Sequence, residues 1–324
     1  MSEAGDYDPG PWKGHDFRSA RRAYDVHAGR SYDNARTSGV SATKCAPTSL
    51  KTDSSVPVVI LVDVTGSMDE WPATIFSKLP YLDLEGKEYL GKDMEICFAA
   101  VGDAHSDKYP LQVQRFAKGT DMKKCLEALI IEGNGGGGAR ESYELGALYF
   151  ARNVKMPNAT KPILIYICDE GIYDFVDSSQ AKTWAKTDIS QRMSSKEAFE
   201  ELKSKYSCYA IRKSYGSSSG DRRSEEDREI QEQWEEYFGA DRVCDLPEAG
   251  RVVDVIFGIF ARETNRVDYF IGELTGRQTP EQVKTVMKSL ESIHKLPAAS
   301  RKKLPSGASV TRRKGCSSES KSLL

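Results

Sequence analysis

The sequence predicts an α/β fold: an open, mostly parallel sheet with one antiparallel edge strand and helices on both faces. A continuous apolar run at residues 56–64 is typical of a strand that is covered on both sides. Further apolar runs alternate with helical patterns, and this order favours parallel strands joined by helices. Only residues 104–110 separate the second and third runs, too few for a parallel crossover, so these two strands should form a hairpin.

Six apolar runs are the predicted strands. They occupy residues 56–64, 95–103, 111–117, 162–169, 206–215 and 242–246. Helical patterns lie between them, the first at residues 121–131. Ser194 and Glu197 form a capping box at a helix start, and Thr279 and Gln282 repeat it with Pro280 at the first helical position. The apolar residues 252–261 predict a packed helix that is too short to cross a membrane.

Composition divides the chain into a central domain with appendages. We predict a partly docked N-terminal arm at 1–55, a central domain at 56–262, a helical extension at 263–295 and a disordered basic tail at 296–324. From residue 295 onward, eight Lys or Arg face one Glu, so this end carries +7 of a net charge of −2 and leaves −9 for the rest. A solvated tail is favoured over an arm that binds nucleic acid.

The sequence also bears on the cellular compartment. No apolar run approaches the ~20 residues that cross a bilayer, and the first thirty residues lack the apolar middle of a signal peptide. Seven scattered cysteines without a CxxC pair favour reduced, mostly buried thiols over a disulfide framework or a zinc site. We therefore expect a cytoplasmic protein with no membrane partner.

Three loops carry polar residues that we expect beyond the carboxyl ends of the strands. The first is Asp63-Val64-Thr65-Gly66-Ser67-Met68, in which a strand-terminal acid precedes two hydroxyl residues. The second is a glycine run, 133–138, followed by Ala139, Arg140, Glu141 and Ser142, and the third is Cys168-Asp169-Glu170-Gly171. Ligands of open α/β sheets collect beyond the carboxyl ends of the strands. Hard oxygen donors of this kind fit Mg²⁺, with Mn²⁺ or Ca²⁺ as substitutes.

On these residues the chain resembles a von Willebrand factor type A domain with a metal-ion-dependent adhesion site. The intracellular form of that family's first motif, Asp-x-Thr-Gly-Ser-Met, matches Asp63, Thr65, Gly66, Ser67 and Met68. Its closing motif, an Asp soon followed by Gly, is matched by Asp169 and Gly171. The resemblance covers residues 56 to about 262 and implies a Rossmann-like fold whose metal ligands include Asp63, Thr65, Ser67 and Asp169.

The middle motif departs from the family pattern. Many members place a metal-contacting Thr there, whereas this chain has Glu141 and Ser142 and resembles a Gly-Gly-Gly-x-x-x-Glu variant. Glu141, Ser142 or a water are the alternatives for that position. Asp63 and Asp169 offset a divalent charge, and a third directly bound acid would weaken attraction for an incoming carboxylate. We therefore expect Glu141 to contact the metal through a water or to contact the direct ligands rather than the metal.

The resemblance implies a binding module rather than a catalyst. In this family the metal keeps an open position that an Asp or Glu of a protein partner completes, and microbial intracellular members often work beside MoxR-type AAA+ ATPases. Two other functions stay open. One is a Mg²⁺-dependent phosphohydrolase with Asp63 as nucleophile, which Thr65 disfavours because such enzymes usually carry a second acid there; the other is nucleic-acid association through the tail.

Neighbouring polar residues receive plainer interpretations. Asp103 and Asp107 are predicted to lie in a solvated hairpin turn rather than to extend an acidic rim. The glycine run lacks the spacing of a phosphate-binding loop and is interpreted as a connector. Residues 217–229 are interpreted as an exposed loop that runs into a charged helix.

Overall fold

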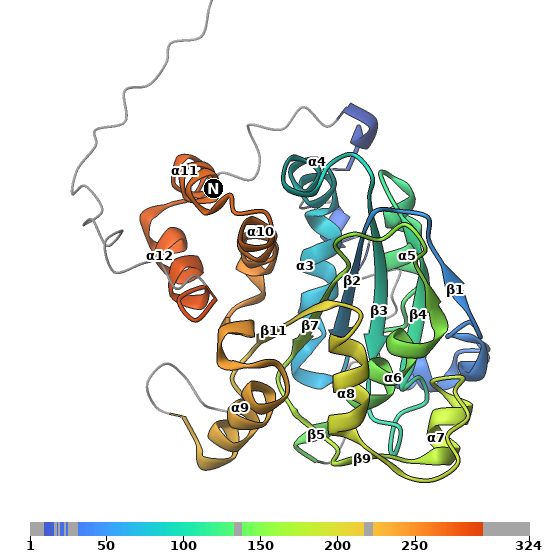
Figure 1. Ribbon diagram of the computed structural model, residues 1–324. Coiled ribbons are helices and arrows are strands. Elements are labelled where there is room, and N and C mark those ends of the chain that lie inside the picture. The colour runs from blue at the N-terminus through green and yellow to red at the C-terminus, as the bar shows by residue number, and fades with distance from the viewer. Residues whose placement is uncertain are drawn as a thin grey trace, which may run out of the picture. The chain divides into compact units, whose positions relative to one another are not determined.

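A six-stranded sheet forms the centre of the molecule (Figure 1). The computed structural model describes residues 10–15, 18, 20–22, 24, 32–132, 138–216 and 223–293. The strands are, in spatial order, β12 (Val243–Asp245), β11 (Ser207–Arg212), β7 (Ile163–Cys168), β2 (Val56–Asp63), β3 (Met94–Val101) and β4 (Leu111–Ala117). All neighbouring pairs are parallel except β3 with β4 at the edge. The predicted fold class, including the hairpin, is confirmed.

Two layers of helices cover the sheet because its strands are apolar on both faces. In β2, Val58, Ile60 and Val62 face one layer, and Val59 and Leu61 face the other. The first layer contains α3 (Glu70–Ser77), α4 (Leu79–Leu90), α5 (Asp121–Glu127), α10 (Val252–Glu263), α11 (Val267–Arg277) and α12 (Pro280–Ser289). The second contains α6 (Tyr143–Asn153), α7 (Ser178–Thr183), α8 (Ser195–Lys203) and α9 (Glu225–Phe238).

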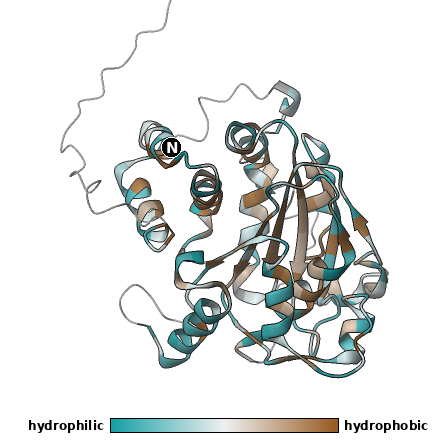
Figure 2. Cartoon of the chain, in the orientation of Figure 1, coloured by the Kyte–Doolittle hydropathy of each residue, from teal (hydrophilic) through white to brown (hydrophobic). Residues whose placement is uncertain are grey.

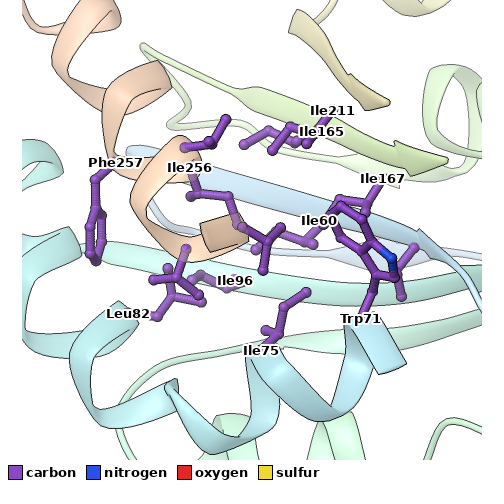
Figure 3. Packing of buried hydrophobic residues seen from close by; sticks show 14 of the residues in the cluster. Ile60, Trp71, Ile75, Leu82, Ile96, Ile165, Ile167, Ile211, Ile256 and Phe257 are labelled. Atoms are coloured by element: carbon purple, nitrogen blue, oxygen red, sulfur yellow. The ribbon is translucent and has the colours of Figure 1, made fainter. Parts of the chain in front are cut away.

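The core of the first layer is built from branched side chains of the strands. Figure 3 shows Ile60, Ile96 and Ile165 of the sheet against Ile75 of α3 and Ile256 of α10. The predicted helix at 252–261 is thus a buried helix of the core. In Figure 2 the central strands are mostly hydrophobic, whereas α9 is largely hydrophilic. Among the described residues, no helix is long and apolar enough to span a membrane.

Helix starts follow the sequence signals. Ser194 and Glu197 make the reciprocal hydrogen bonds of a capping box at the start of α8. Thr279 and Gln282 do the same at α12, with Pro280 in the first turn. These two predictions are confirmed, and each satisfies backbone N–H groups that a helix start leaves unpaired.

Short elements complete the described chain. Three two-stranded ladders join β1 (Leu50–Lys51) with β6 (Val154–Lys155), β9 (Phe175–Val176) with β10 (Met193–Ser194), and β5 (Arg140–Glu141) with β8 (Gly171–Ile172). The short helices are η1 (Gly10–Trp12), α2 (Tyr32–Thr37), η2 (Ala42–Lys44), η3 (Gly66–Met68), η4 (Ala240–Arg242) and η5 (Ala249–Arg251). Cys97, Cys125, Cys168, Cys208 and Cys244 are buried free thiols.

Residues near the N-terminus contribute to the core of the first layer. Trp12 and Tyr24 are 2% and 1% exposed. The indole Nε1 of Trp12 donates to Asp83 Oδ2 (3.0 Å), and Asp83 Oδ1 also accepts from the backbone of Gly119 (3.1 Å). The ring of Tyr24 lies 4.7 Å from that of Phe76. The boundaries predicted at residues 55, 262 and 295 stay predictions, and the tail at 296–324 lies outside the described residues.

Candidate metal centre

The first and third loops lie at the same edge of the sheet. Strands β2 and β7 are parallel neighbours, with Val62 in register with Ile167. Asp63 ends β2 and Asp169 directly follows β7, so both acids emerge at adjacent carboxyl ends. Asp63 is fully buried and Asp169 is 2% exposed. The charge of Asp169 contributes to raising the pKa of Asp63, so the two carboxyl groups influence each other.

The Asp63 carboxylate is fixed by hydrogen bonds at both of its oxygens. Oδ1 accepts from the backbone N of Thr65 (2.8 Å) and from its hydroxyl (2.6 Å). Oδ2 accepts from the hydroxyl of Tyr143 (2.6 Å), a residue that begins α6 in the second layer. A hydroxyl that donates to a carboxylate keeps its own lone pairs, so Thr65 Oγ1 is still able to bind a cation.

The two-residue ladder of β5 and β8 brings Glu141 close to Asp63 and Thr65. The register of Glu141 with Ile172 connects the second loop to the third, and Gly171 N donates to Ala139 O (2.8 Å) next to it. Glu141 is 1% exposed, and its Oε1 lies 3.3 Å from Thr65 Oγ1. Within the described part of the chain, no hydrogen-bond donor reaches its Oε2. A buried, unpaired carboxylate oxygen is costly unless a proton or a cation satisfies it.

Ser142 serves a different loop. Its hydroxyl accepts from the backbone N of Ala104 (2.9 Å), and it lies 3.5 Å from Asp103 Oδ1. Of the two middle-motif residues, Glu141 is therefore the one that contacts Thr65. The backbone of Ser67 lies in η3, but its side chain and the glycines at 133–137 lie outside the described residues.

The electrostatics of the loops are dominated by acids. Burial and the charge of Asp169 raise the pKa of Asp63, and burial together with Asp63 and Glu170 raises the pKa of Glu141. Burial and the charges of Asp63 and Asp169 raise the pKa of Glu170 to about 9. Each acid thus resists ionisation because it is desolvated beside others of like charge. A divalent cation would reverse that tendency.

Basic side chains nearby are already engaged. Arg212, at the carboxyl end of β11, is fully buried and forms an ion pair with Asp227 of α9. Its Nη1 also donates to Gln231 Oε1 (2.9 Å). Arg140, beside Glu141, pairs instead with the exposed Asp174 (3.1 Å). These two guanidinium groups are therefore committed to other acids.

Helix α9 holds the third loop in place through hydrogen bonds to its backbone. Gln233 donates to Ile172 O (2.9 Å) and accepts from Ile172 N (2.8 Å), as a neighbouring strand would. The indole of Trp234 donates to Glu170 O (2.9 Å) and lies 5.1 Å from the ring of Tyr143. Trp234 is fully buried, so this charged helix has a supporting face that no sequence motif indicated.

Of the two acids in the β3–β4 hairpin, Asp103 contradicts the sequence interpretation, and Asp107 is half-buried. Asp103 is 5% exposed, where a solvated turn was predicted. It accepts from the backbone N of His105 (3.0 Å), and Asp107 accepts from the backbone N of Asp103 (2.7 Å). Burial raises the pKa of Asp107. The interpretation as a solvated turn was wrong for Asp103, because this end of the hairpin packs against the start of α6, where Ser142 N donates to Gly102 O (3.2 Å).

The donor set fits a hard cation with few direct carboxylates. No group of three or more His, Cys, Asp or Glu in the described ranges is spaced to hold a metal by such side chains alone. Asp63 and Asp169 would therefore depend on hydroxyl and water oxygens to complete a shell, as Mg²⁺ commonly does. The unpaired oxygen of Glu141 is a further acceptor for water in that shell.

Comparisons with known proteins add little to this geometry. The sequence matches no protein-family model and no curated protein. Among solved structures, the chain is similar to the pilus adhesin SpaC of Lactobacillus rhamnosus GG in an open conformation, with a TM-score of 0.44 and 12% identity over 69% of this chain. A second form of that adhesin gives a TM-score of 0.42 and 11% identity over 68%. The chain spans 31% of the adhesin's length, and this likeness carries no argument about function.

Proposed function

We propose that the chain is a divalent-metal-dependent protein-binding module of the von Willebrand factor A type. Asp63, Thr65, Ser67 and Asp169 would hold Mg²⁺, or Mn²⁺ or Ca²⁺ in its place, and Glu141 would contact the ion through water. The metal would supply an electrophilic position for an Asp or Glu of a protein partner. The module would then act as an intracellular adaptor or assembly factor.

The unpaired Glu141 oxygen is the observation that carries this proposal. Glu141 is buried beside Asp63, and the pKa values of both are raised by burial and by neighbouring acids. A structural role alone does not explain why buried acids gather without a cation. A bound divalent ion would satisfy them and would tie the three loops together.

The chain itself would perform three tasks at this site. The hydrogen bonds of Thr65 and Tyr143 orient the Asp63 carboxylate. The β5–β8 ladder holds Glu141 against the third loop, and Gln233 and Trp234 brace that loop. Burial excludes bulk water, which strengthens a charged contact with a partner.

The observations favour this function over the alternatives. A phosphohydrolase with Asp63 as nucleophile would usually carry a second acid where this chain has Thr65. It would also need a basic group for the phosphoryl oxygens, yet Arg212 and Arg140 pair with other acids. Nucleic-acid binding through residues 296–324 concerns a segment outside the described residues. A MoxR-type AAA+ ATPase is one class of partner that the family likeness suggests.

Isothermal titration with MgCl₂ tests the metal site. Wild type should bind one ion, and the double variant Asp63→Ala with Ser67→Ala should lose binding. Asp83→Ala is the matched control, since Asp83 is a buried aspartate (1% exposed) whose hydrogen bonds go to Trp12 and Gly119 rather than to the three loops. Absence of magnesium binding to the folded wild type would refute the proposal.

Partner capture then tests how the site is used. Wild type should capture a partner in MgCl₂ but not in EDTA. Asp63→Ala should not capture that partner in MgCl₂. A partner retained equally in EDTA would show that the metal does not gate binding. Phosphatase turnover that Asp63→Asn abolishes would instead favour the enzymatic alternative.

A further inference from the structure

Tyr143 is a buried phenol that contacts the strand-end acid of the first loop. It is fully buried, and its hydroxyl donates to Asp63 Oδ2 at 2.6 Å. No sequence motif pointed to it. Its ring lies edge-on to Trp234 at 5.1 Å, and its backbone oxygen accepts from the hydroxyl of Tyr166 (3.1 Å). The phenol is therefore held in place by the second helical layer and by β7.

The hydrogen bonds at Asp63 limit how it can bind a cation. A carboxylate offers about four lone-pair positions, two on each oxygen. Thr65 fills both positions of Oδ1 through its N–H and its hydroxyl. Among the described side chains, Tyr143 fills one position of Oδ2, and the other is open to a cation. Rotation of the carboxylate would break hydrogen bonds at both ends, so its plane is fixed.

Single-oxygen binding discriminates between divalent ions. Ca²⁺ takes six to eight oxygens, often with a carboxylate bound through both oxygens, whereas Mg²⁺ requires a near-octahedral set of single oxygens. A carboxylate that pivots freely can adopt either mode. One that is pinned at both oxygens withholds the two-oxygen mode that Ca²⁺ can also use, so it favours Mg²⁺.

We propose that Tyr143 is a positioning residue that restricts Asp63 to single-oxygen binding and so makes the site selective for Mg²⁺ over Ca²⁺. This inference rests on the proposed metal-dependent function. It assigns the selectivity to a group that does not itself bind the metal. Thr65 anchors one oxygen, and the phenol prevents the carboxylate from pivoting about that anchor.

Titrations with MgCl₂ and CaCl₂ on three proteins test this proposal. The proteins are wild type, Tyr143→Phe and the control Tyr149→Phe, which loses an equally buried phenol hydroxyl of the same helix that bonds to the backbone oxygen of Pro47 instead of to Asp63. We expect the ratio of the Ca²⁺ to the Mg²⁺ dissociation constant to fall about tenfold in Tyr143→Phe, the equivalent of one charged hydrogen bond. The ratio in Tyr149→Phe should equal that of wild type.

Each outcome supports or overturns the assignment. If wild type binds Mg²⁺ and Tyr143→Phe keeps the wild-type ratio, the inference is wrong and the proposed function stands. If both Phe variants lower the ratio equally, general loosening of the core is responsible and the inference is wrong. If folded wild type binds neither ion, the proposed function fails and the inference falls with it.

A second variant covers the case in which Tyr143→Phe does not fold. Trp234→Phe keeps the Tyr143 hydroxyl but removes part of the surface that holds its ring. Because this variant also loses the indole hydrogen bond to Glu170 O, it is compared with Gln233→Leu, which loosens the same loop at Ile172 and should keep the wild-type ratio. The ratio in Trp234→Phe should fall by about threefold, because the phenol is less firmly placed. An unchanged ratio in folded Trp234→Phe would overturn the proposal.

Discussion

Acids at the two ends of the central sheet have opposite environments. At the amino end, Glu263 accepts hydrogen bonds from Ser207 (2.8 Å), Tyr209 and Arg242 (3.0 Å). Burial alone would raise the pKa of Glu263, but these hydrogen bonds and the charge of Arg242 lower it. At the carboxyl end, burial and like charges raise the pKa values of Asp63, Glu141 and Glu170. The first end is complete within the chain, whereas the second has acids that a ligand would satisfy.

This difference separates stability from function. A paired acid contributes to folding through its partners, and its loss should lower stability without affecting a distant ligand. An acid with an unpaired buried oxygen, as in Glu141, opposes folding, and its retention indicates a task outside folding. The two kinds of site should therefore respond oppositely to the same substitution.

The largest expected effect is that one substitution lowers only the affinity for Mg²⁺ and the other lowers only stability. Asp169→Asn should weaken Mg²⁺ binding at least ~100-fold, because loss of a direct ligand should exceed the effect of losing a supporting residue. Glu263→Gln should leave Mg²⁺ affinity unchanged and lower the free energy of unfolding by about 2 kcal/mol, because Arg242 loses its charged partner. Calorimetric titration and urea denaturation measure the two effects. Equal loss of affinity in both variants would remove the distinction.

A comparison of two buried glutamates has the next largest expected effect, a change in stability. Glu132 and Glu141 are each 1% exposed, but Glu132 accepts from the backbone N of Lys108 (3.2 Å) and Tyr109 (3.0 Å). Glu132→Gln should lower metal-free stability by about 2 kcal/mol, because an amide donor would face a backbone donor. Glu141→Gln should raise it by about 2 kcal/mol, because the amide removes an uncompensated acid. Denaturation in EDTA measures both, and a loss of stability in Glu141→Gln would contradict the comparison.

Dependence on pH should also differ between the ends. Glu170 has a pKa raised from 4.5 to about 9, so the folded protein keeps a proton that the unfolded chain releases in that window. The free energy of unfolding in EDTA should therefore fall as the pH rises from about 4.5 to 9. Glu263, with its lowered pKa, contributes stability that is present above 4.5 and is lost as the pH falls through its folded value.

Magnesium should remove the loss of stability with rising pH that Glu170 causes. The ion takes the place of the retained protons, so the rise in melting temperature caused by MgCl₂ should be larger at pH 8 than at pH 5.5. Differential scanning calorimetry in MgCl₂ and in EDTA provides the measurement. A rise that is the same at both pH values would mean that the acids of the carboxyl end do not take part in binding.

The smallest expected effect concerns support of the third loop. Gln233→Leu removes both hydrogen bonds to Ile172 and should weaken Mg²⁺ binding about fivefold, with a loss of stability of about 1 kcal/mol. Gln231→Leu is a suitable control on the same helix, because Gln231 bonds to Arg212 and Glu235 instead. Titration should show wild-type affinity for the control, and a matching loss there would assign the effect to α9 as a whole.

The fold was predictable because its signals are local. The apolar run at 56–64, the capping boxes at Ser194 and Thr279 and the short connection at 104–110 each determine their own element. Parallel pairing then follows from the helices between strands. Asp63 and Asp169 could be placed at one edge for the same reason, since each directly follows a strand.

The support of the candidate site was not predictable in the same way. Tyr143 reaches Asp63 across 80 positions of sequence, and Trp234 reaches Glu170 across 64. A Tyr or Trp in an amphipathic helix has the same pattern whether it fills a core or orients a carboxylate. The β5–β8 ladder has two residues in each strand, too short to give a period. Burial of Asp103 likewise depends on packing against α6, which the turn sequence does not encode.

Docking of the N-terminal segment has a consequence for biosynthesis. Trp12 leaves the ribosome long before Asp83 and Gly119, the residues that complete its polar contact, so this indole stays without its final surroundings until α4 and the loop after β4 are made. Chaperones would meet an aromatic segment during that interval. A shortened gene that starts at Val56 would leave the Phe76 side of α3 without Tyr24, and its product should aggregate more readily.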